Sequence, residues 1–204
     1  MYPFNTSISN IWRSWYAFVA GKNKTLELEE FRYGLEENLG QLQQDIESNC
    51  YKHGTYRRFI VCDNKRREIR VASIRDRVIH RLLYDYLVEI YDKTFIFDVW
   101  SCRKNKGLIG AIGRAQEFLH KNPESIVWRT DIRKFFDNID REVLLSVLER
   151  KVKDKKALSL LYEVIDGGRA GRLSLSLSLS RLSSPKRYPN WQFNEPGFSE
   201  YLYE

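Results

Sequence analysis

Residues 125–140 read SIVWRTDIRKFFDNID, and this stretch decides the fold class that the sequence predicts. An apolar run enters after Asn122-Pro123, which interrupts the helical pattern before it, and the run ends at Asp131. We therefore predict a strand that delivers Asp131 at its end, followed by a helix for which Asp140 is the N-cap. A carboxylate in this position can hold a divalent metal, but an aspartate after a strand is more often a turn or helix cap, and the stretch alone favours the cap.

Most of the sequence before this stretch has the apolar spacing of helices. One long amphipathic helix is predicted from Leu28 onward, because apolar residues recur three or four apart as far as Ile46. A later segment, residues 74–91, has an apolar face broad enough to be buried between neighbours. The remaining predicted helices are a short one before residue 24, one over residues 109–120, one over residues 141–151 and one running toward residue 165.

Between the first two of these helical regions the period changes to that of strands. Residues 55–72 read TYRRFIVCDNKRREIRVA, which predicts two short strands, residues 56–62 and 68–72. A polar turn, Asp63-Asn64-Lys65, joins them. We therefore predict a β-hairpin that is rich in arginine.

Composition indicates a globular protein with a basic surface. Lys and Arg number 34 against 27 Asp and Glu, so the formal charge is +7 and the pI is near 9.3. This balance suits a polyanionic partner such as nucleic acid or anionic lipid, and it equally suits a solvated basic surface. Three cysteines with no C-x-x-C spacing indicate neither a disulfide framework nor a zinc knuckle. Without a signal peptide or a long apolar run, we predict a soluble cytoplasmic protein that does not enter a membrane.

The order of these motifs resembles a known enzyme family. A basic hairpin is followed by RDRVIHRLLYDYL, FIFDVWSCRKNKG, a helix, and then an apolar strand with DIRKFFDNID. This order is similar to the fingers and first palm segment of bacterial reverse transcriptases of the retron, group II intron and diversity-generating retroelement types. The resemblance covers residues 31–166 and implies an α/β fold, with a helix-rich fingers lobe, a basic β-hairpin and a partial palm of a right-hand polymerase. The domains expected are an N-terminal helical extension (1–24), a fingers-like region (25–121), a partial palm (122–166) and a low-complexity tail (167–204).

The resemblance implies roles for two residues of the opening stretch. In the family the aspartate that begins D-x-x-x-x-F binds the catalytic metals, and this position corresponds to Asp131. The aromatic residue five positions later excludes ribonucleotides and corresponds to Phe136, although a core aromatic remains the alternative. Carboxylate oxygens are the ligands that Mg²⁺ prefers in phosphoryl transfer. The implied activity is RNA-directed DNA synthesis with Mg²⁺, an RNA template, a DNA primer and deoxynucleoside triphosphates.

Several basic residues match positions that contact substrates in the family. Arg67 is the best match for a residue that neutralises the triphosphate, with Lys65 and Arg70 behind it; a solvated hairpin face is the alternative. Arg75 and Arg77 resemble an R-D-R element that lies near the template, and an internal ion pair explains them equally well. The loop with Arg103, Lys104 and Lys106 suits contact with a phosphate backbone. His80 is expected to be packed or paired rather than catalytic, and Phe135 and Trp128 are expected to be core residues.

Other parts of the family's active site have no match in this sequence. A Tyr-x-Asp-Asp turn supplies further carboxylates in the family, and no Asp-Asp pair occurs in this sequence. We expect a chain truncated after the first palm motif, without a thumb, by a frameshift near the Leu-Ser repeat of residues 173–180. Read one nucleotide later, the codons of the tail permit KGIPIGNLTSQ, which resembles the family's template-supporting motif. We therefore expect an inactive and marginally stable reverse-transcriptase fragment, and the alternative is a non-catalytic nucleic-acid-binding module.

Overall fold

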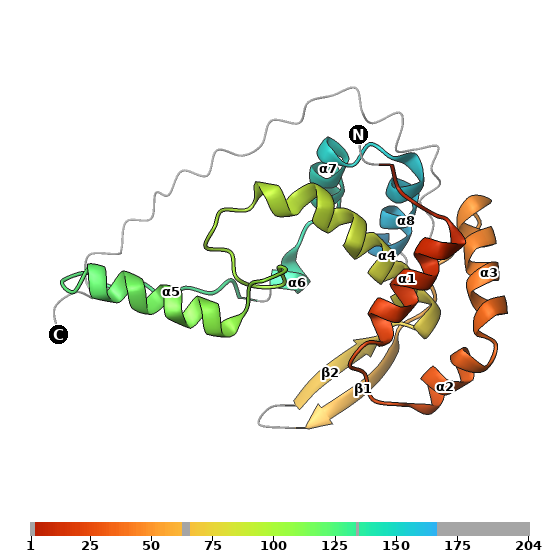
Figure 1. Cartoon of the computed structure of the whole chain (residues 1–204), viewed down its shortest axis with the longest axis horizontal. Coiled ribbons are helices and arrows are strands. Elements are labelled where there is room, and N and C mark those ends of the chain that lie inside the picture. The colour runs from red at the N-terminus through yellow and green to blue at the C-terminus, as the bar shows by residue number, and fades with distance from the viewer. Residues whose placement is uncertain (1–2, 63–65, 134, 167–204) are drawn as a thin grey trace. The chain divides into compact units, whose positions relative to one another are not determined.

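The computed structural model describes residues 3–62, 66–133 and 135–166, and for Arg67, Phe136 and Asp137 it describes the backbone alone. The predictions for Lys65 and for residues 167–204 lie outside these residues. The described part is helix-rich with one small antiparallel sheet, which agrees with the predicted α/β class (Figure 1). Its elements are α1 (Ile8–Val19), α2 (Leu26–Tyr33), α3 (Leu35–Glu47), β1 (Arg57–Cys62), β2 (Arg66–Val71), α4 (Ile74–Tyr91), a 3₁₀ turn (Asp92–Thr94), α5 (Leu108–Lys121), α6 (Phe135–Asn138), α7 (Arg141–Lys151) and α8 (Lys155–Asp166).

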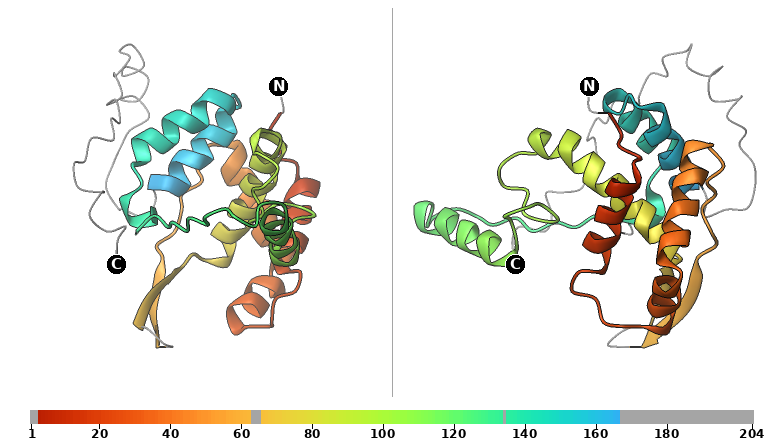
Figure 2. Two further views of the ribbon diagram at one scale, coloured as in Figure 1. Left: turned by 90° about the vertical axis from the view of Figure 1, so that its left-hand side faces the viewer. Right: turned by 45° about the vertical axis from the view of Figure 1, so that its right-hand side comes forward.

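The hydrophobic core is centred on α4. Helix α1 lies across α4 and also contacts α3, while α8 contacts α4 and α7 (Figure 2). Trp15 is 1% exposed and stacks on Phe31 at a ring-centroid distance of 5.2 Å. The helices of this core are therefore held mainly by apolar burial from faces that their 3.6-residue period predicts. The core side chains with the least exposure come from α1 (Ile11, Trp15), α3 (Leu39, Leu42, Ile46), α4 (Val78, Ile79, Leu82), the C-cap of α7 (Val152) and the start of α8 (Ala157).

The predicted long helix of residues 28–46 is two helices, so this prediction was wrong in its continuity. Helix α2 ends at Tyr33 and α3 begins at Leu35, with Gly34 between them in a non-helical conformation. The Asn38 side-chain amide donates a hydrogen bond of 2.9 Å to the Phe31 carbonyl, which satisfies one of the open carbonyls at the end of α2. The apolar period continues across the break, since Leu28, Leu39, Leu42 and Ile46 are all buried. Periodicity alone could not reveal the break.

The predicted β-hairpin is present, and its register gives it two different faces. Arg57 pairs with Val71, Phe59 with Ile69 and Val61 with Arg67 across the two strands, and the alternating pairs are Arg58 with Arg70, Ile60 with Glu68 and Cys62 with Arg66. Residues directly opposite each other share a face of a sheet. One face therefore carries the apolar residues Phe59, Val61, Ile69 and Val71 together with Arg57 and the position of Arg67. The other gathers Arg58, Arg66 and Arg70 with Glu68, and it also carries Ile60 and Cys62. We call the second the basic face of the hairpin.

The predicted strand of residues 125–131 does not form, and the prediction that Trp128 is a core residue was wrong as well. Residues 125–132 have no regular secondary structure, and the Trp128 side chain is 86% exposed. A strand is stabilised by pairing with a neighbour and by covering an apolar face, and among the described residues β1 and β2 pair with each other alone. Asp140 caps α7 as predicted, because its carboxyl group accepts a 3.1 Å hydrogen bond from the Val143 amide.

Helix α5 is held to the preceding loop through close contacts at its first turn. Its Gly110 lies against the Trp100 ring, so that a Cβ at this position would be 2.6 Å from a ring carbon. Arg114 forms an ion pair with Asp98 at 2.9 Å. None of the buried residues belongs to α5, and Ile109 is 88% exposed. This helix therefore depends on a small contact area.

A methyl group at Gly110 is expected to weaken the attachment of α5. Gly110→Ala raises helix propensity, but the overlap with Trp100 costs about 1–3 kcal/mol, as overpacking commonly does. Hydrogen exchange followed by mass spectrometry should show faster exchange across residues 95–121 and unchanged exchange in α1 and α3. Gly113→Ala is the matched control, since nothing lies within 4 Å of a Cβ there. Equal exchange in both variants would contradict the close contact.

None of the described helices is long and apolar enough to cross a bilayer.

Candidate nucleic-acid interface

The basic face of the hairpin is a group of exposed cations that the strand register brings together. Arg58, Arg66 and Arg70 are all exposed, and Glu68 lies between them. Glu68 accepts ion pairs from Arg70 at 3.1 Å and from Arg58 at 3.8 Å, each largely solvent-exposed. Three guanidinium groups against one carboxylate leave a net positive surface that suits phosphate oxygens. The sequence singled out Arg70 but missed Arg58 and Arg66, which only the cross-strand register brings onto the same face.

The other two predicted hairpin residues are less well defined. Arg67 pairs with Val61 in the register, and its backbone alone is described. Lys65 lies in the turn outside the described residues. Their predicted contacts with a triphosphate remain predictions.

The predicted template residues Arg75 and Arg77 both have internal partners. Arg75 forms an ion pair with Asp45 and lies over the Tyr51 ring at 4.9 Å. Arg77 approaches Glu27 at 3.7 Å, and its Nε atom is buried without a hydrogen-bond partner in the described part of the chain. These contacts agree with the ion-pair alternative. Their binding to nucleic acid remains a prediction.

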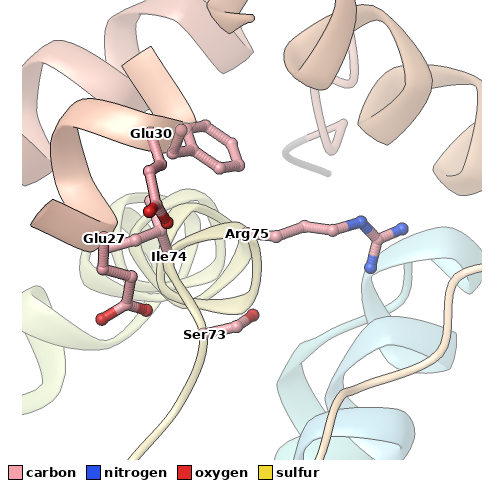
Figure 3. Close-up of a pocket in the computed structure, with 6 residues that line it drawn as sticks. Glu27, Glu30, Ser73, Ile74 and Arg75 are labelled. Carbon is pink, nitrogen blue, oxygen red and sulfur yellow. The ribbon is translucent and has the colours of Figure 1, made fainter. Parts of the chain in front are cut away.

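A shallow pocket lies beside Arg75, between α2 and the N-terminal end of α4 (Figure 3). Its volume is about 240 Å³, and Glu27, Glu30, Phe31, Ser73, Ile74 and Arg75 line it. Figure 3 shows the Arg75 side chain extending away from the two glutamates. The pocket therefore presents carboxylates to solvent, which disfavours an anionic ligand at this position.

In the basic loop before α5, two of the cationic side chains bind groups of the same loop and of the 3₁₀ turn before it. Arg103 forms an ion pair with Asp92 at 2.7 Å and donates to the carbonyls of Ile96 and Val99 at 3.1 and 3.4 Å. Its hydrogen bond holds the pKa of the Asp92 carboxyl below the ordinary value. Lys106 donates to the Phe97 carbonyl and lies 3.5 Å from the centroid of that ring.

Lys104 is exposed and lines a cleft of about 490 Å³ between α1 and α4. It is the member of the predicted loop set that makes no hydrogen bond or ion pair within the described residues. Arg103 and Lys106 shape the loop, whereas Lys104 is the most available to a phosphate group. The predicted role of all three toward nucleic acid is untested.

Asp131 lies in the irregular segment between α5 and α6, exposed to solvent. It makes no hydrogen bond or ion pair with another described residue. Phe136 lies in α6, where its backbone alone is described. In the described ranges no three His, Cys, Asp or Glu side chains gather as a metal site would require. A single exposed carboxylate does not fit a two-metal centre, so these residues do not supply a Mg²⁺ site by themselves.

A buried polar cluster that the sequence analysis missed lies where the hairpin joins the helical core. Its centre is Asp76, which is 1% exposed. The Asp76 carboxyl group accepts hydrogen bonds from the Tyr51 hydroxyl at 2.8 Å, the Ser73 hydroxyl at 2.6 Å and the Gly54 amide at 3.2 Å. A Cβ at Gly54 would be 2.9 Å from the Asp76 carboxyl oxygen, so a larger residue there would displace this carboxyl group. We call Tyr51, His53, Gly54, Ser73, Asp76 and His80 the Asp76 cluster.

His80 is paired, as predicted, and its partner is His53. Their Nε2 atoms are 3.0 Å apart, and the rings are nearly parallel with centroids 5.1 Å apart. Burial lowers the pKa of His80, the His53 ring and Arg77 lower it further, and Asp76 opposes the shift. Burial raises the pKa of the Tyr51 hydroxyl, and so does its hydrogen bond to Asp76. The cluster therefore favours a neutral His80 ring and a neutral Tyr51 phenol.

The depressed pKa of His80 predicts that stability falls in mild acid. The unfolded chain takes up a proton near the ordinary value of 6.5, whereas the folded chain resists it. The stabilisation is therefore complete above pH 6.5 and is lost as the pH falls toward the folded pKa. Urea unfolding at pH 7.5, 6.5 and 5.5 should show a declining free energy, and His80→Gln should flatten the decline. The depressed carboxyl groups Glu47 and Asp92 titrate in a lower window.

Comparisons with known proteins show that this chain has distant relatives. No protein-family model matches the chain. Over 132 residues, 64% of the chain, it is 26% identical to the "Putative COX1/OXI3 intron 2 protein" of Saccharomyces cerevisiae, and the match spans 15% of that protein. Over 102 residues it is 26% identical to the "Putative COX1/OXI3 intron 1 protein" of the same yeast, spanning 12% of it. Over 155 residues, 74% of the chain, it is 23% identical to Protein YkfC of Escherichia coli K12, spanning 40% of it.

These similarities indicate a distant relationship to proteins of COX1/OXI3 introns. The chain spans less than half the length of each relative that it matches.

Proposed function

We propose that this chain is the fingers region and first palm segment of a reverse-transcriptase-related protein of an intron or another retroelement. The similarity to two intron proteins carries this proposal. The exposed basic face of the hairpin supports it, because a template and a primer present rows of phosphates to such a surface. In this proposal the intact protein extends a DNA primer on an RNA template with deoxynucleoside triphosphates and Mg²⁺.

The chain by itself binds RNA and does not extend a primer. Asp131 stands alone among the described residues as a candidate ligand, and phosphoryl transfer of this kind needs several carboxylates around two metals. The alternative function, a nucleic-acid-binding module without catalysis, makes the same forecast for this chain. The two differ in whether a second polypeptide that supplies a Tyr-x-Asp-Asp motif restores synthesis.

A primer-extension assay and an RNA-binding titration test the proposal together. The purified 204-residue chain is mixed with a labelled DNA primer annealed to RNA, deoxynucleoside triphosphates and Mg²⁺. We expect no extension, and salt-sensitive binding of the primer–template. Extension by this chain would overturn the claim of inactivity. Absence of RNA binding at 20 mM salt would overturn the nucleic-acid function altogether.

Charge removal on the basic face of the hairpin locates the binding surface. The triple variant Arg58→Gln, Arg66→Gln, Arg70→Gln removes three exposed cations. If each contacts one phosphate of a single strand, the slope of log affinity against log salt becomes shallower by roughly 2, at about 0.7 per contact. The matched control is Lys24→Gln, Lys121→Gln, Lys155→Gln, which removes the same charge from exposed positions elsewhere. Equal losses in both triples would mean that net charge, rather than the hairpin, binds RNA.

A further inference from the structure

We propose that His53 and His80 form a proton-operated lock that holds residues 51–56 against α4 and α8. We call residues 51–56 the connector, because they join α3 to β1. The connector is attached to the helices at Tyr51, His53 and Gly54. Tyr51 and Gly54 donate to Asp76 on α4, and the His53 amide donates to Glu163 on α8 at 3.3 Å. The His53 ring, which is buried and stacked on Tyr56 at 4.9 Å, makes the remaining attachment.

The hydrogen bonds of His53 define which nitrogen carries its proton. Nδ1 of His53 lies 2.7 Å from the Gly54 carbonyl, which is an acceptor, so Nδ1 is the donor. In a neutral ring Nε2 of His53 then has a free lone pair. It accepts the hydrogen bond of 3.0 Å from Nε2 of His80, which is therefore protonated at that atom. Both rings are neutral in the locked state.

The first added proton leaves this bond intact, and the second breaks it. A proton added to the other nitrogen, Nδ1, of His80 leaves its Nε2–H donating to His53. A further proton must go to Nε2 of His53, where the lone pair was. Two N–H donors then face each other 3.0 Å apart with no acceptor between them, and two like charges repel across the same distance. The lock therefore opens when both rings are charged.

The groups around His53 and His80 determine the pH at which the lock opens. Burial lowers the pKa of His80, and so does the His53 ring. Because two charged rings repel each other across the shared contact, the second proton is harder to add than the first. Asp76 acts in the other direction. The charged and titratable groups around the pair are Tyr51, Lys52 and Tyr56 on the connector, Arg75, Asp76 and Arg77 on α4, Arg141 on α7 and Glu163 on α8.

Opening the lock frees the root of the hairpin while the helical core stays folded. The core of α1, α3 and α4 is apolar, so charge on two imidazoles does not affect it directly. β1 begins one residue after the connector. The basic face of the hairpin therefore gains freedom relative to α4 in mild acid.

Histidine-detected and backbone NMR of the uniformly ¹⁵N-labelled full chain tests the lock. The chain has three histidines, and the third, His120, is exposed on α5 and gives the reference titration. Between pH 7.5 and 5 we expect the pair to titrate in two steps, the second well below His120. We expect the amide signals of residues 51–62 to shift or broaden with that second step, while those of α1 and α3 stay unchanged. If both rings titrate together with His120, or if the α1 and α3 signals are lost at the same pH as the connector signals, the lock is refuted.

Two variants separate the lock from a general loss of stability. His80→Gln places an amide beside His53 that can donate its N–H to the neutral ring and, after rotation, present its carbonyl oxygen to the charged ring, so the connector should stay attached down to pH 5. His80→Phe removes the donor, and the connector should be loose already at pH 7.5. His120→Gln should leave the opening pH unchanged. A connector that still opens in His80→Gln at the wild-type pH, or an ordered connector in His80→Phe, refutes the lock.

Discussion

Asp76→Ala is expected to lower the free energy of unfolding by roughly 3–5 kcal/mol, because it removes the acceptor at the centre of a buried cluster. The Tyr51 and Ser73 hydroxyls and the Gly54 amide all donate to this carboxyl group. Without it the buried Tyr51 hydroxyl loses its partner, and so do the more exposed Ser73 hydroxyl and Gly54 amide. For a small domain with an ordinary net stability, this loss is a large part of the whole. Urea unfolding followed by circular dichroism measures it.

A second aspartate on the same helix provides the control for this prediction. Asp85 also lies on α4, but it is partly exposed and pairs with Arg81 four residues earlier at 3.0 Å. Such a pair contributes about 0.3–0.5 kcal/mol, so Asp85→Ala should be nearly neutral. Losses of similar size in the two variants would contradict the central role of Asp76.

Trp15→Ala is the other large effect, with an expected loss of roughly 3–5 kcal/mol in the free energy of unfolding. The indole is almost fully buried between α1 and its neighbours, where it stacks on Phe31 and approaches Phe18 at a centroid distance of 6.0 Å. Removing it leaves a cavity that rigid helices cannot refill. A thermal or urea melt of the variant should show a much lower midpoint than the wild type.

Trp128→Ala is the matched control, because it deletes the same side chain from an exposed position. Its indole contributes little to the folded state, so the stability should change by less than about 0.5 kcal/mol. The same substitution, tryptophan to alanine, is therefore expected to cause a large loss of stability at Trp15 and almost none at Trp128. An equal loss of stability in both variants would mean that the segment around Trp128 is covered in solution.

Much of the helical part of the fold follows from the sequence. Residues 74–91 form a helix with the bounds that the sequence predicted, and the apolar positions from Leu28 to Ile46 face the core. The local sequence pattern was misleading where the structure of a segment depends on contacts with other segments of the chain. The apolar period carried no sign of the break at Gly34. The β-pattern of residues 125–131 predicted a strand that finds no pairing neighbour within the described part of the chain. A strand needs another segment of chain, which no local pattern can guarantee.

The sequence predicted which charged residues belong to the candidate site, but it did not predict how they are arranged in space. An arginine-rich hairpin could be recognised directly, but the grouping of Arg58, Arg66 and Arg70 depends on the cross-strand register. The Asp76 cluster was missed for a different reason. Its members Tyr51, His53, Asp76 and His80 come from two separate segments, and each is an ordinary residue in its own segment. One signal was present: an aspartate at the third position of a broad apolar helix requires buried partners.

The open segment around Ile126, Val127 and Trp128 has a consequence for the amount of this protein in a cell. Chaperones and proteases act on chains that expose apolar stretches, and an exposed segment without regular secondary structure can enter a protease active site without prior unfolding. The half-life of this chain would then be governed by the accessibility of one short segment rather than by the stability of its helical core. A partner that covers the segment would therefore raise the abundance of the chain without changing its fold.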